Sequence, residues 1–361
     1  MRSLDVGLRM SIPAALGKDQ WGYQTMTKNR VSGDLGRTIR TVRTRKRGFP
    51  HTGWAWEGIV DDFEDHLIKL GAKQVGDPRP RPLFDQVGRA LSRARIPIPR
   101  RQDQPVRVVA MMGTKPRLLF PSAYSGQLAL FIWDCWPTDQ KRWESIFRHS
   151  KPRYVFFTSR FAAEFWRPLL ADVEVFWAPE AIKPALYECK VPLANRGTFL
   201  LELGRKHHMF HSQAVEAVRD LGLRHLYSTA ERPFLFPDRA SLVAGIQDSA
   251  VMSCYPASTT DPGGRAGSWP TMTYRYLEAA AARTLIVGEI PQDMKDLFGF
   301  TPGVHVPSEK AGEHLREIAS KLPEYQDLVD KVHHRLHEVA TWDVRTKEIF
   351  GTISGERETP S

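Results

Sequence analysis

Arg275 and Glu278 stand three positions apart and are well placed to bind one ligand together. A Gly/Pro-rich loop, Asp261–Pro270, leads into a helix expected over 271–282, and a short apolar strand, Thr284–Val287, follows it. The start of a helix offers unpaired N–H groups and a positive dipole end, and an i,i+3 pair lies on one helical face. This order of elements predicts a phosphate site at the end of a sheet. The alternative is a surface ion pair on an ordinary amphipathic helix.

Further candidates for anion binding surround this pair. Arg205 and Lys206 come directly after the strand expected over 198–203. Cations directly after a strand end can bind an anionic ligand, because α/β folds bind ligands at the carboxyl ends of their strands. Arg205 could instead cap the edge of the sheet. Thr273 and Tyr274 offer hydroxyl groups to a phosphate or a base, although Tyr274 is equally suited to packing.

Asp134 is the candidate catalytic residue. It lies at the end of an expected strand, between Trp133 and Trp136. Aromatic surroundings can raise the pKa of a carboxylate, which suits it to act as a base toward an acceptor hydroxyl. An N-cap of the following helix is the alternative role. His51 and His66 are alternative bases, and each is also an ordinary surface or packing histidine.

The pattern from Arg107 onward predicts an α/β protein. Apolar runs predict strands over 108–112, 128–133, 154–158, 173–177, 198–203, 224–227, 250–254 and 284–287, with helices near 140–147, 161–170, 210–221, 240–247 and 271–282. Such alternation favours parallel sheets, with ligands at the carboxyl ends of the strands. Gly204-Arg205, Tyr255–Gly267 and 288–291 all follow predicted strands. The loop Tyr255–Gly267, with Arg265, could be a phosphate nest, a mobile lid or a solvated loop.

Length and breaks in the pattern predict two domains in the 361 residues. We expect an N-terminal domain over 1–179, of which 1–105 is basic and gives the weakest pattern, and a hinge over 180–197. A ligand-binding domain follows over 198–340, and a closing helix and tail over 341–361. Within the first part, a helix is expected over 54–70, and residues 5–50 give no firm assignment.

Positive charge is concentrated in the first third of the chain. Residues 1–105 hold 20 Lys and Arg against 11 Asp and Glu, a difference of +9 within a total of +10. A solvated basic face is the simplest explanation. Binding to nucleic acid, or to an anionic membrane surface, is the alternative. The densest run consists of Arg37, Arg40, Arg43, Arg45, Lys46 and Arg47, and a second extends over 79–101.

Composition excludes several other classes of protein. No apolar run is as long as a membrane span, and the N-terminus lacks a signal peptide's apolar core. Cys135, Cys189 and Cys254 are widely separated and show no metal-ligand spacing, so we expect reduced thiols in a cytoplasmic protein. The histidines at 207–208 and 333–334 are adjacent and have no companion cysteines, so no metal site is predicted.

Residues 105–350 resemble the GT-B glycosyltransferases, especially their spore-maturation-like branch. The resemblance rests on the Arg-x-x-Glu-Ala-x-Ala helix at Arg275, on Thr198–Arg205, on Leu130–Pro137 and Tyr154–Phe165, and on Thr341-Trp342 with Arg345. It implies two Rossmann-like domains facing each other across a cleft, with a C-terminal helix crossing back. One departure is Pro270, where many relatives carry a second glutamate. Donor contacts of that glutamate are therefore not carried over.

The resemblance implies sugar transfer from a nucleotide sugar, a UDP- or GDP-sugar, to a hydroxyl acceptor, with no other cofactor and no metal. It assigns the diphosphate to Arg205 and Arg275, and the ribose to Glu278. The basic first third favours DNA carrying a hydroxylated base as the acceptor, which would have to be flipped out of a duplex. A small metabolite or a surface glycan is the enzymatic alternative, with the basic face on membrane lipid. The non-enzymatic alternative is a nucleic-acid-binding protein built on a degenerate transferase fold.

Overall fold

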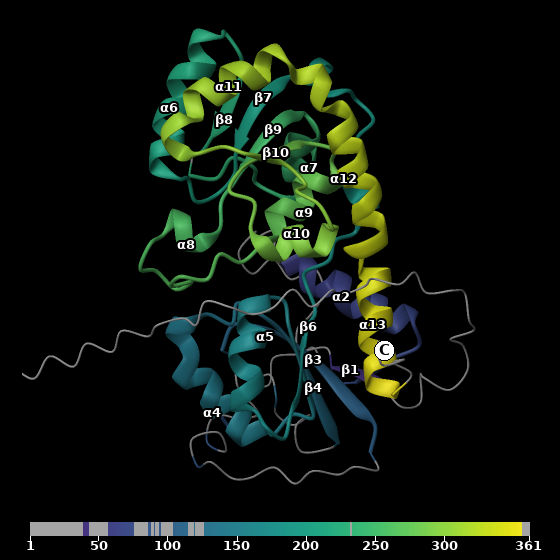
Figure 1. Ribbon diagram of the computed structural model, residues 1–361. Coiled ribbons are helices and arrows are strands. Elements are labelled where there is room, and N and C mark those ends of the chain that lie inside the picture. Colours follow the sequence, from purple (N-terminus) through teal and green to yellow (C-terminus); the bar gives the residue numbers. More distant parts are fainter. Residues whose placement is uncertain are drawn as a thin grey trace, which may run out of the picture. The chain divides into compact units, whose positions relative to one another are not determined.

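Two parallel β-sheets, each with helices, make up the described part of the chain (Figure 1). The computed structural model describes residues 39–42, 57–75, 86–87, 90, 94, 104–114, 119, 126–231 and 233–355. Within these residues, no helix is both long enough and apolar enough to span a bilayer. The predicted α/β class, with two parallel sheets, is confirmed.

The first sheet has six strands in the order β2-β1-β3-β4-β5-β6, and every neighbouring pair is parallel. Its central strands are apolar along almost their whole length, as expected of strands covered on both faces. The strands are β1 Ile39–Val42, β2 Lys73–Val75, β3 Val106–Met112, β4 Gln127–Trp133, β5 Tyr154–Phe157 and β6 Glu174–Trp177. The helices between them are α2 Glu57–Lys69, α4 Gln140–Ser150 and α5 Arg160–Trp166.

The second sheet has five parallel strands in the order β11-β10-β9-β7-β8. The chain order reverses between β7 and β9, so the loops after these strands flank the point where such folds bind ligands. The strands are β7 Thr198–Glu202, β8 His225–Tyr227, β9 Ser249–Cys254, β10 Leu285–Gly288 and β11 Val304–His305. The helices are α6 His208–Asp220, α7 Arg239–Gln247, α8 Ala257–Thr260, α9 Tyr274–Ala281, α10 Gln292–Phe298, α11 Ala311–Ser320 and α12 Gln326–Val339.

Two differences from the sequence predictions matter for the site. β1 was missed, because its four residues, Ile-Arg-Thr-Val, interrupt a basic run and show little apolar pattern. Helix α9 starts at Tyr274 rather than at 271. The cause is Asp293, whose two carboxylate oxygens accept the backbone N–H of Met272 at 3.2 and 2.9 Å and hold this stretch outside the helix. The predicted domain boundaries remain predictions.

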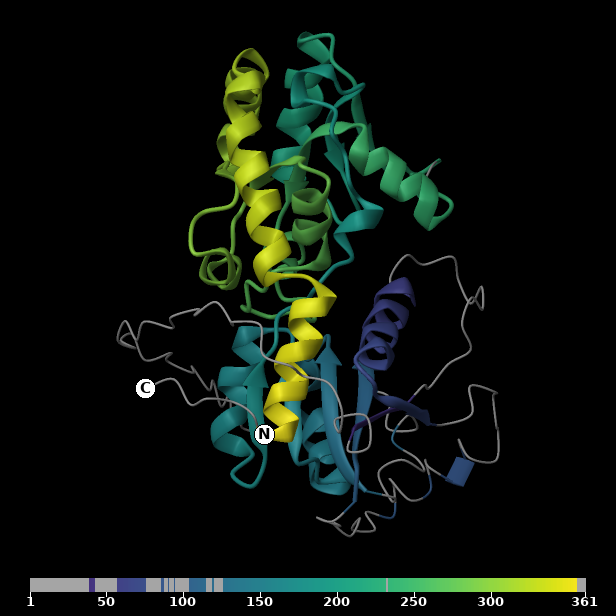
Figure 2. The same ribbon diagram turned by 90° about the vertical axis from the view of Figure 1, so that its right-hand side faces the viewer.

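The chain passes between the sheets twice, and the two passages are hydrogen-bonded to each other. Ile182, after β6, pairs with Thr341, after α12. The Ile182 N–H donates to the carbonyl of Ala340 at 2.9 Å. The last helix, α13 Trp342–Ser354, then packs with α2 on the first sheet (Figure 2). Its first residue, Trp342, belongs to the same apolar cluster as Phe63, Phe131 and Trp133. The predicted return of the C-terminal helix is confirmed.

Candidate functional site

Arg275 and Gly204 bring the two predicted cationic motifs together. Gly204 follows β7 with a φ of +78°, and a Cβ built on it would overlap the guanidinium group of Arg275 on α9. The guanidinium therefore lies against the backbone of Gly204, and only glycine leaves room for it. Burial lowers the pKa of Arg275, and the nearby charge of Arg205 lowers it further, whereas Glu278 opposes the shift. Two arginines and one carboxylate thus meet beside the carboxyl end of β7.

Glu278 is buried, and its carboxylate has a hydroxyl partner. Its Oε1 accepts the hydroxyl of Tyr187 at 2.9 Å. Burial raises the pKa of Glu278, against the effects of Tyr187, Arg275 and Arg239. Such a carboxylate can accept hydrogen bonds from hydroxyl groups of a ligand in the way it accepts that of Tyr187.

The other three predicted donor residues differ in their surroundings. Lys206 donates to the carbonyl of Ser228 at 2.7 Å and lies over the ring of Tyr227, 5.1 Å from its centroid. Thr273 is the N-cap of α9 but makes no side-chain capping bond. The ring of Tyr274 packs against apolar clusters of both sheets, and its buried hydroxyl has no hydrogen-bond partner among the described residues. These contacts favour packing for the ring of Tyr274, and a contact of its hydroxyl with the donor stays a prediction.

Asp134 follows β4 in the left-handed region, with a φ of +53°. Outside glycine this conformation is uncommon and is concentrated at functional sites. The N-cap of the next helical turn is Trp136, without a side-chain capping bond, so the interpretation of Asp134 as a helix cap was wrong. The alternative base His66 contacts the backbone carbonyl of Asp62 at 2.6 Å, a local packing role, and His51 lies outside the described residues.

Glu180 belongs to this group of carboxylates and was missed in the sequence. One of its carboxylate oxygens, Oε2, is buried and without a hydrogen-bond partner among the described residues. Burial raises the pKa of Glu180 well above its ordinary value, and the charges of Asp134, Asp293 and Glu278 raise it further. Its position in Ala-Pro-Glu-Ala, soon after β6, was interpreted only as hinge sequence. The signal that could have identified Glu180 in the sequence is a carboxylate soon after the end of a strand.

The glycine-rich loop after β9 contacts the turn Pro137–Asp139, which precedes α4. Arg265 donates to Asp139 Oδ2 at 3.2 Å, and the carbonyl of Arg265 accepts the hydroxyl of Thr138 at 3.2 Å. Nearby, the hydroxyls of Ser159 and Thr271 are 2.9 Å apart. Among the three interpretations of this loop, these contacts favour a closing segment over a solvated loop.

A buried charge cluster lies just before Gly204. Glu202 Oε1 is 2.6 Å from His211 Nδ1 and 2.9 Å from His225 Nε2. Burial raises the pKa of Glu202, but the two histidines outweigh it, so the pKa lies below its ordinary value. The 2.6 Å separation is that of a hydrogen bond and shorter than the spacing of two ligands on one metal ion. The two histidines therefore hold the buried Glu202 carboxylate just before Gly204.

Of the cations in the basic run Arg37–Arg47, the structure describes only Arg40. Arg40 lies in β1, paired in register with Lys73 and Arg107 on the neighbouring strands. The remaining residues of the predicted polyanion site lie outside the described residues; they are Arg37, Arg43, Arg45, Lys46 and Arg47.

Comparison with solved structures decides the fold. AviGT4, a glycosyltransferase involved in avilamycin A biosynthesis, superposes with a TM-score of 0.51 at 15% identity over 88% of this chain and 98% of its own. Anabaena HepE in complex with UDP and glucose gives 0.56 at 11% identity, over 88% and 99%. Sucrose-phosphate synthase from Thermosynechococcus elongatus gives 0.53 at 11%, over 88% and 98%. The chain has the GT-B glycosyltransferase fold.

Sequence comparison adds no closer relative. Neither a protein-family model nor a curated protein sequence matches this GT-B chain. At these identities the structural neighbours share the fold, and activity has to be argued from the site.

Proposed function

We propose that this GT-B protein transfers a sugar from a nucleoside-diphosphate sugar to a hydroxyl acceptor. The observation that supports it best is the contact between Gly204 and Arg275 at the carboxyl edge of the second sheet. It places a guanidinium beside a strand end that flanks the reversal of strand order, where α/β folds bind nucleotides. The structural neighbour HepE was solved in complex with UDP and UDP-glucose, which agrees with this donor class.

In this proposal, Arg275 and Arg205 bind the diphosphate. Both are cations close enough for the charge of one to lower the pKa of the other. Two like charges held together are unfavourable until an anion joins them, so their proximity favours a ligand with two negative groups. As the sugar leaves, charge on the diphosphate grows, and fixed cations stabilise that transition state. We propose that no metal is needed at this position.

Glu278 binds the ribose in the same proposal. Its buried carboxylate already accepts one hydroxyl, that of Tyr187, and the ribose hydroxyls would donate to it in the same way. Thr273, at the start of α9, and Lys206 remain candidates for contacts with the phosphate or base.

Asp134 and Glu180 are the candidates for proton transfer. The charge of Asp134 raises the pKa of Glu180, as two neighbouring carboxyls do when one keeps its proton. We assign the proton to Glu180 and leave Asp134 as the carboxylate that accepts the proton of the acceptor hydroxyl. The acceptor oxygen then bonds to the sugar carbon, and the bond to the diphosphate oxygen breaks.

A titration of the purified protein with UDP and GDP, followed by calorimetry, tests the donor site. We expect one nucleotide to bind, and Glu278→Gln to weaken binding about tenfold, since a hydrogen bond to a charged group contributes roughly 1.5–3 kcal/mol. Glu216→Gln, an exposed change on α6, is the control and should bind as wild type. Chelator-treated protein should bind equally well. Absence of binding by either nucleotide, or equal binding by Glu278→Gln, contradicts the proposal.

For the acceptor, we propose DNA carrying a hydroxylated base. The support is the positive charge of the first third of the chain, which can neutralise several phosphates. Mass analysis of nucleosides from modified and unmodified DNA, incubated with the protein and nucleotide sugars, tests it. A glycosylated nucleoside only from modified DNA is the expected result. DNA binding that survives Arg205→Ala and Glu278→Ala, without any hydrolysis of nucleotide sugar, would instead indicate the non-catalytic alternative.

A further inference from the structure

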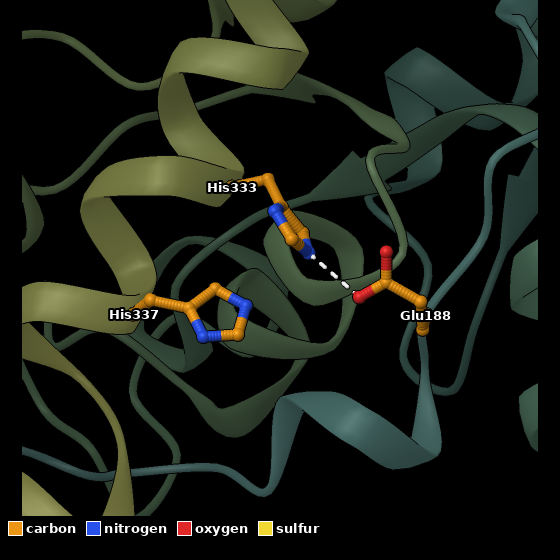
Figure 3. Close-up of side chains that lie close together, drawn as sticks. All are labelled: Glu188, His333 and His337. Atoms are coloured by element: carbon orange, nitrogen blue, oxygen red, sulfur yellow. Dashed lines mark ion pairs between the residues drawn. The ribbon is translucent and has the colours of Figure 1, made fainter.

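Three side chains that can bind a metal ion, none of them a member of the Arg275 group, converge on one another. His333 and His337 are one helical turn apart on α12, so they lie on the same face of that helix. Glu188 lies in the segment between β6 and β7. Figure 3 shows its carboxylate and both imidazole rings turned toward a common space. The sequence prediction compared His333 with its neighbour His334 and overlooked the partner four positions on.

The spacing of these groups suits one metal ion. The nitrogen and oxygen atoms that they can offer all lie within 4.8 Å of one another. His333 Nε2 is 3.4 Å from Glu188 Oε2, and the two rings are 4.7 Å apart between centroids. Ligands at about 2.0–2.1 Å from a tetrahedral zinc ion are about 3.3 Å apart, which matches the nitrogen–oxygen distance.

His333 has an unused ligand atom. Its side chain is only 8% exposed, and its buried Nε2 has no hydrogen-bond partner among the described residues. Imidazole binds metal ions through a ring nitrogen, so a buried Nε2 that faces Glu188 is suitably placed as a ligand atom. The contact with Glu188 Oε2, at 3.4 Å, is long for a hydrogen bond, and a metal ion between the two atoms would bind both.

Arg283 engages only one of the two oxygens of Glu188. It donates to Glu188 Oε1 at 2.8 Å and also contacts Asp330 at 3.1 Å. One guanidinium is thus shared between two carboxylates. The second oxygen of Glu188, the one that faces His333, is not used by Arg283.

We propose that Glu188, His333 and His337 bind a divalent transition-metal ion such as Zn²⁺, with water as the fourth ligand. Two imidazoles and one carboxylate favour zinc, copper or nickel over magnesium or calcium. The ion connects the segment of Glu188, which precedes the second sheet, with α12, which follows the last strand of that sheet. It therefore stabilises the region next to the Ile182–Thr341 pairing. This proposal is independent of the proposed sugar transfer.

The test uses untagged, chelator-treated full-length protein and a calorimetric titration with Zn²⁺. We expect one equivalent to bind and His337→Ala to weaken binding at least tenfold. His337 is exposed, so the variant should fold. The matched control is His334→Ala on the same helix, whose side chain is 81% exposed and contacts Glu338 instead. It should bind Zn²⁺ as wild type does.

A second readout separates a specific site from surface binding. Saturating Zn²⁺ should raise the melting temperature of wild type and of His334→Ala, but not that of His337→Ala or Glu188→Gln. Circular dichroism of the metal-free variants checks their folding. Equal binding by wild type and His337→Ala overturns the proposal, as does loss of binding in His211→Ala alone, which would move the site to Glu202. An equal response to Mg²⁺ also overturns it.

Discussion

The guanidinium group of Arg275 lies against the backbone of Gly204, in the space that a Cβ at position 204 would occupy. A strand end and a helix start that are far apart in the sequence thereby form one cationic site.

Gly204→Ala should abolish nucleotide binding by displacing Arg275. We expect the affinity for UDP or GDP to fall at least tenfold, measured by calorimetry. Gly222→Ala is the matched control, because Gly222 also has a positive φ, +67°, but open space around it. Both variants should lose about 1 kcal/mol of stability through the left-handed backbone. Equal nucleotide affinity in the two variants would show that Arg275 does not bind the donor.

Asp134→Asn should lower the rate of sugar transfer about 100-fold or more, the usual contribution of a general base. Glu180→Gln should have a smaller effect, under tenfold, because glutamine keeps the neutral, hydrogen-bonding character of a protonated glutamate. Steady-state rates with a saturating donor measure both, and nucleotide affinity is the control for folding. Full activity of Asp134→Asn would show that Asp134 is not the general base and would indicate a mechanism without a side-chain base.

Asp293 should make the protein less stable as the pH rises. Burial raises its pKa from 3.8 to about 7, so between these values the folded state holds a proton that the unfolded state has lost. The free energy of unfolding therefore falls through this window, by roughly 4 kcal/mol at most at 1.36 kcal/mol per pKa unit. Urea unfolding at pH 5 and pH 8 measures the part of this fall that lies above pH 5, roughly 3 kcal/mol. Asp293→Asn should show a smaller fall than wild type, and the exposed Asp172→Asn should show the same fall as wild type.

Replacing Arg43, Arg45, Lys46 and Arg47 with glutamine should weaken DNA binding without changing nucleotide affinity. The slope of log K against log salt should decrease by roughly three to four, about 0.9 for each phosphate that is no longer neutralised. Retention on heparin should fall as well. The control replaces four exposed cations of the second half, Lys310, Arg316, Lys321 and Lys331. Equal DNA affinity in the two variants rejects the basic run as the contact surface.

Much of the fold could be predicted because its strands are continuous apolar runs. β4 and β5 are buried along nearly their whole length, and the Gly and Pro residues between elements mark their ends. β1 could not be predicted, because an arginine interrupts four residues whose partners lie far along the chain. The start of α9 depends on the side chain of Asp293, which no local pattern reports.

The candidate site was predicted less completely. Arg205, Arg275 and Glu278 follow from motif and strand order, since both signals point to one edge of the sheet. Glu180 does not, because its surroundings come from three other elements that meet only after folding. The packing of Tyr274 against both sheets is equally a product of tertiary contacts.

The return of α13 to the first sheet has a consequence for synthesis of the chain. Trp342 and Phe350 complete the cluster around Phe63, Phe131 and Trp133. A ribosome makes these two residues only after the whole second sheet, so the nascent first domain carries an uncovered aromatic surface throughout that time. A chain interrupted before Trp342 should therefore aggregate rather than fold.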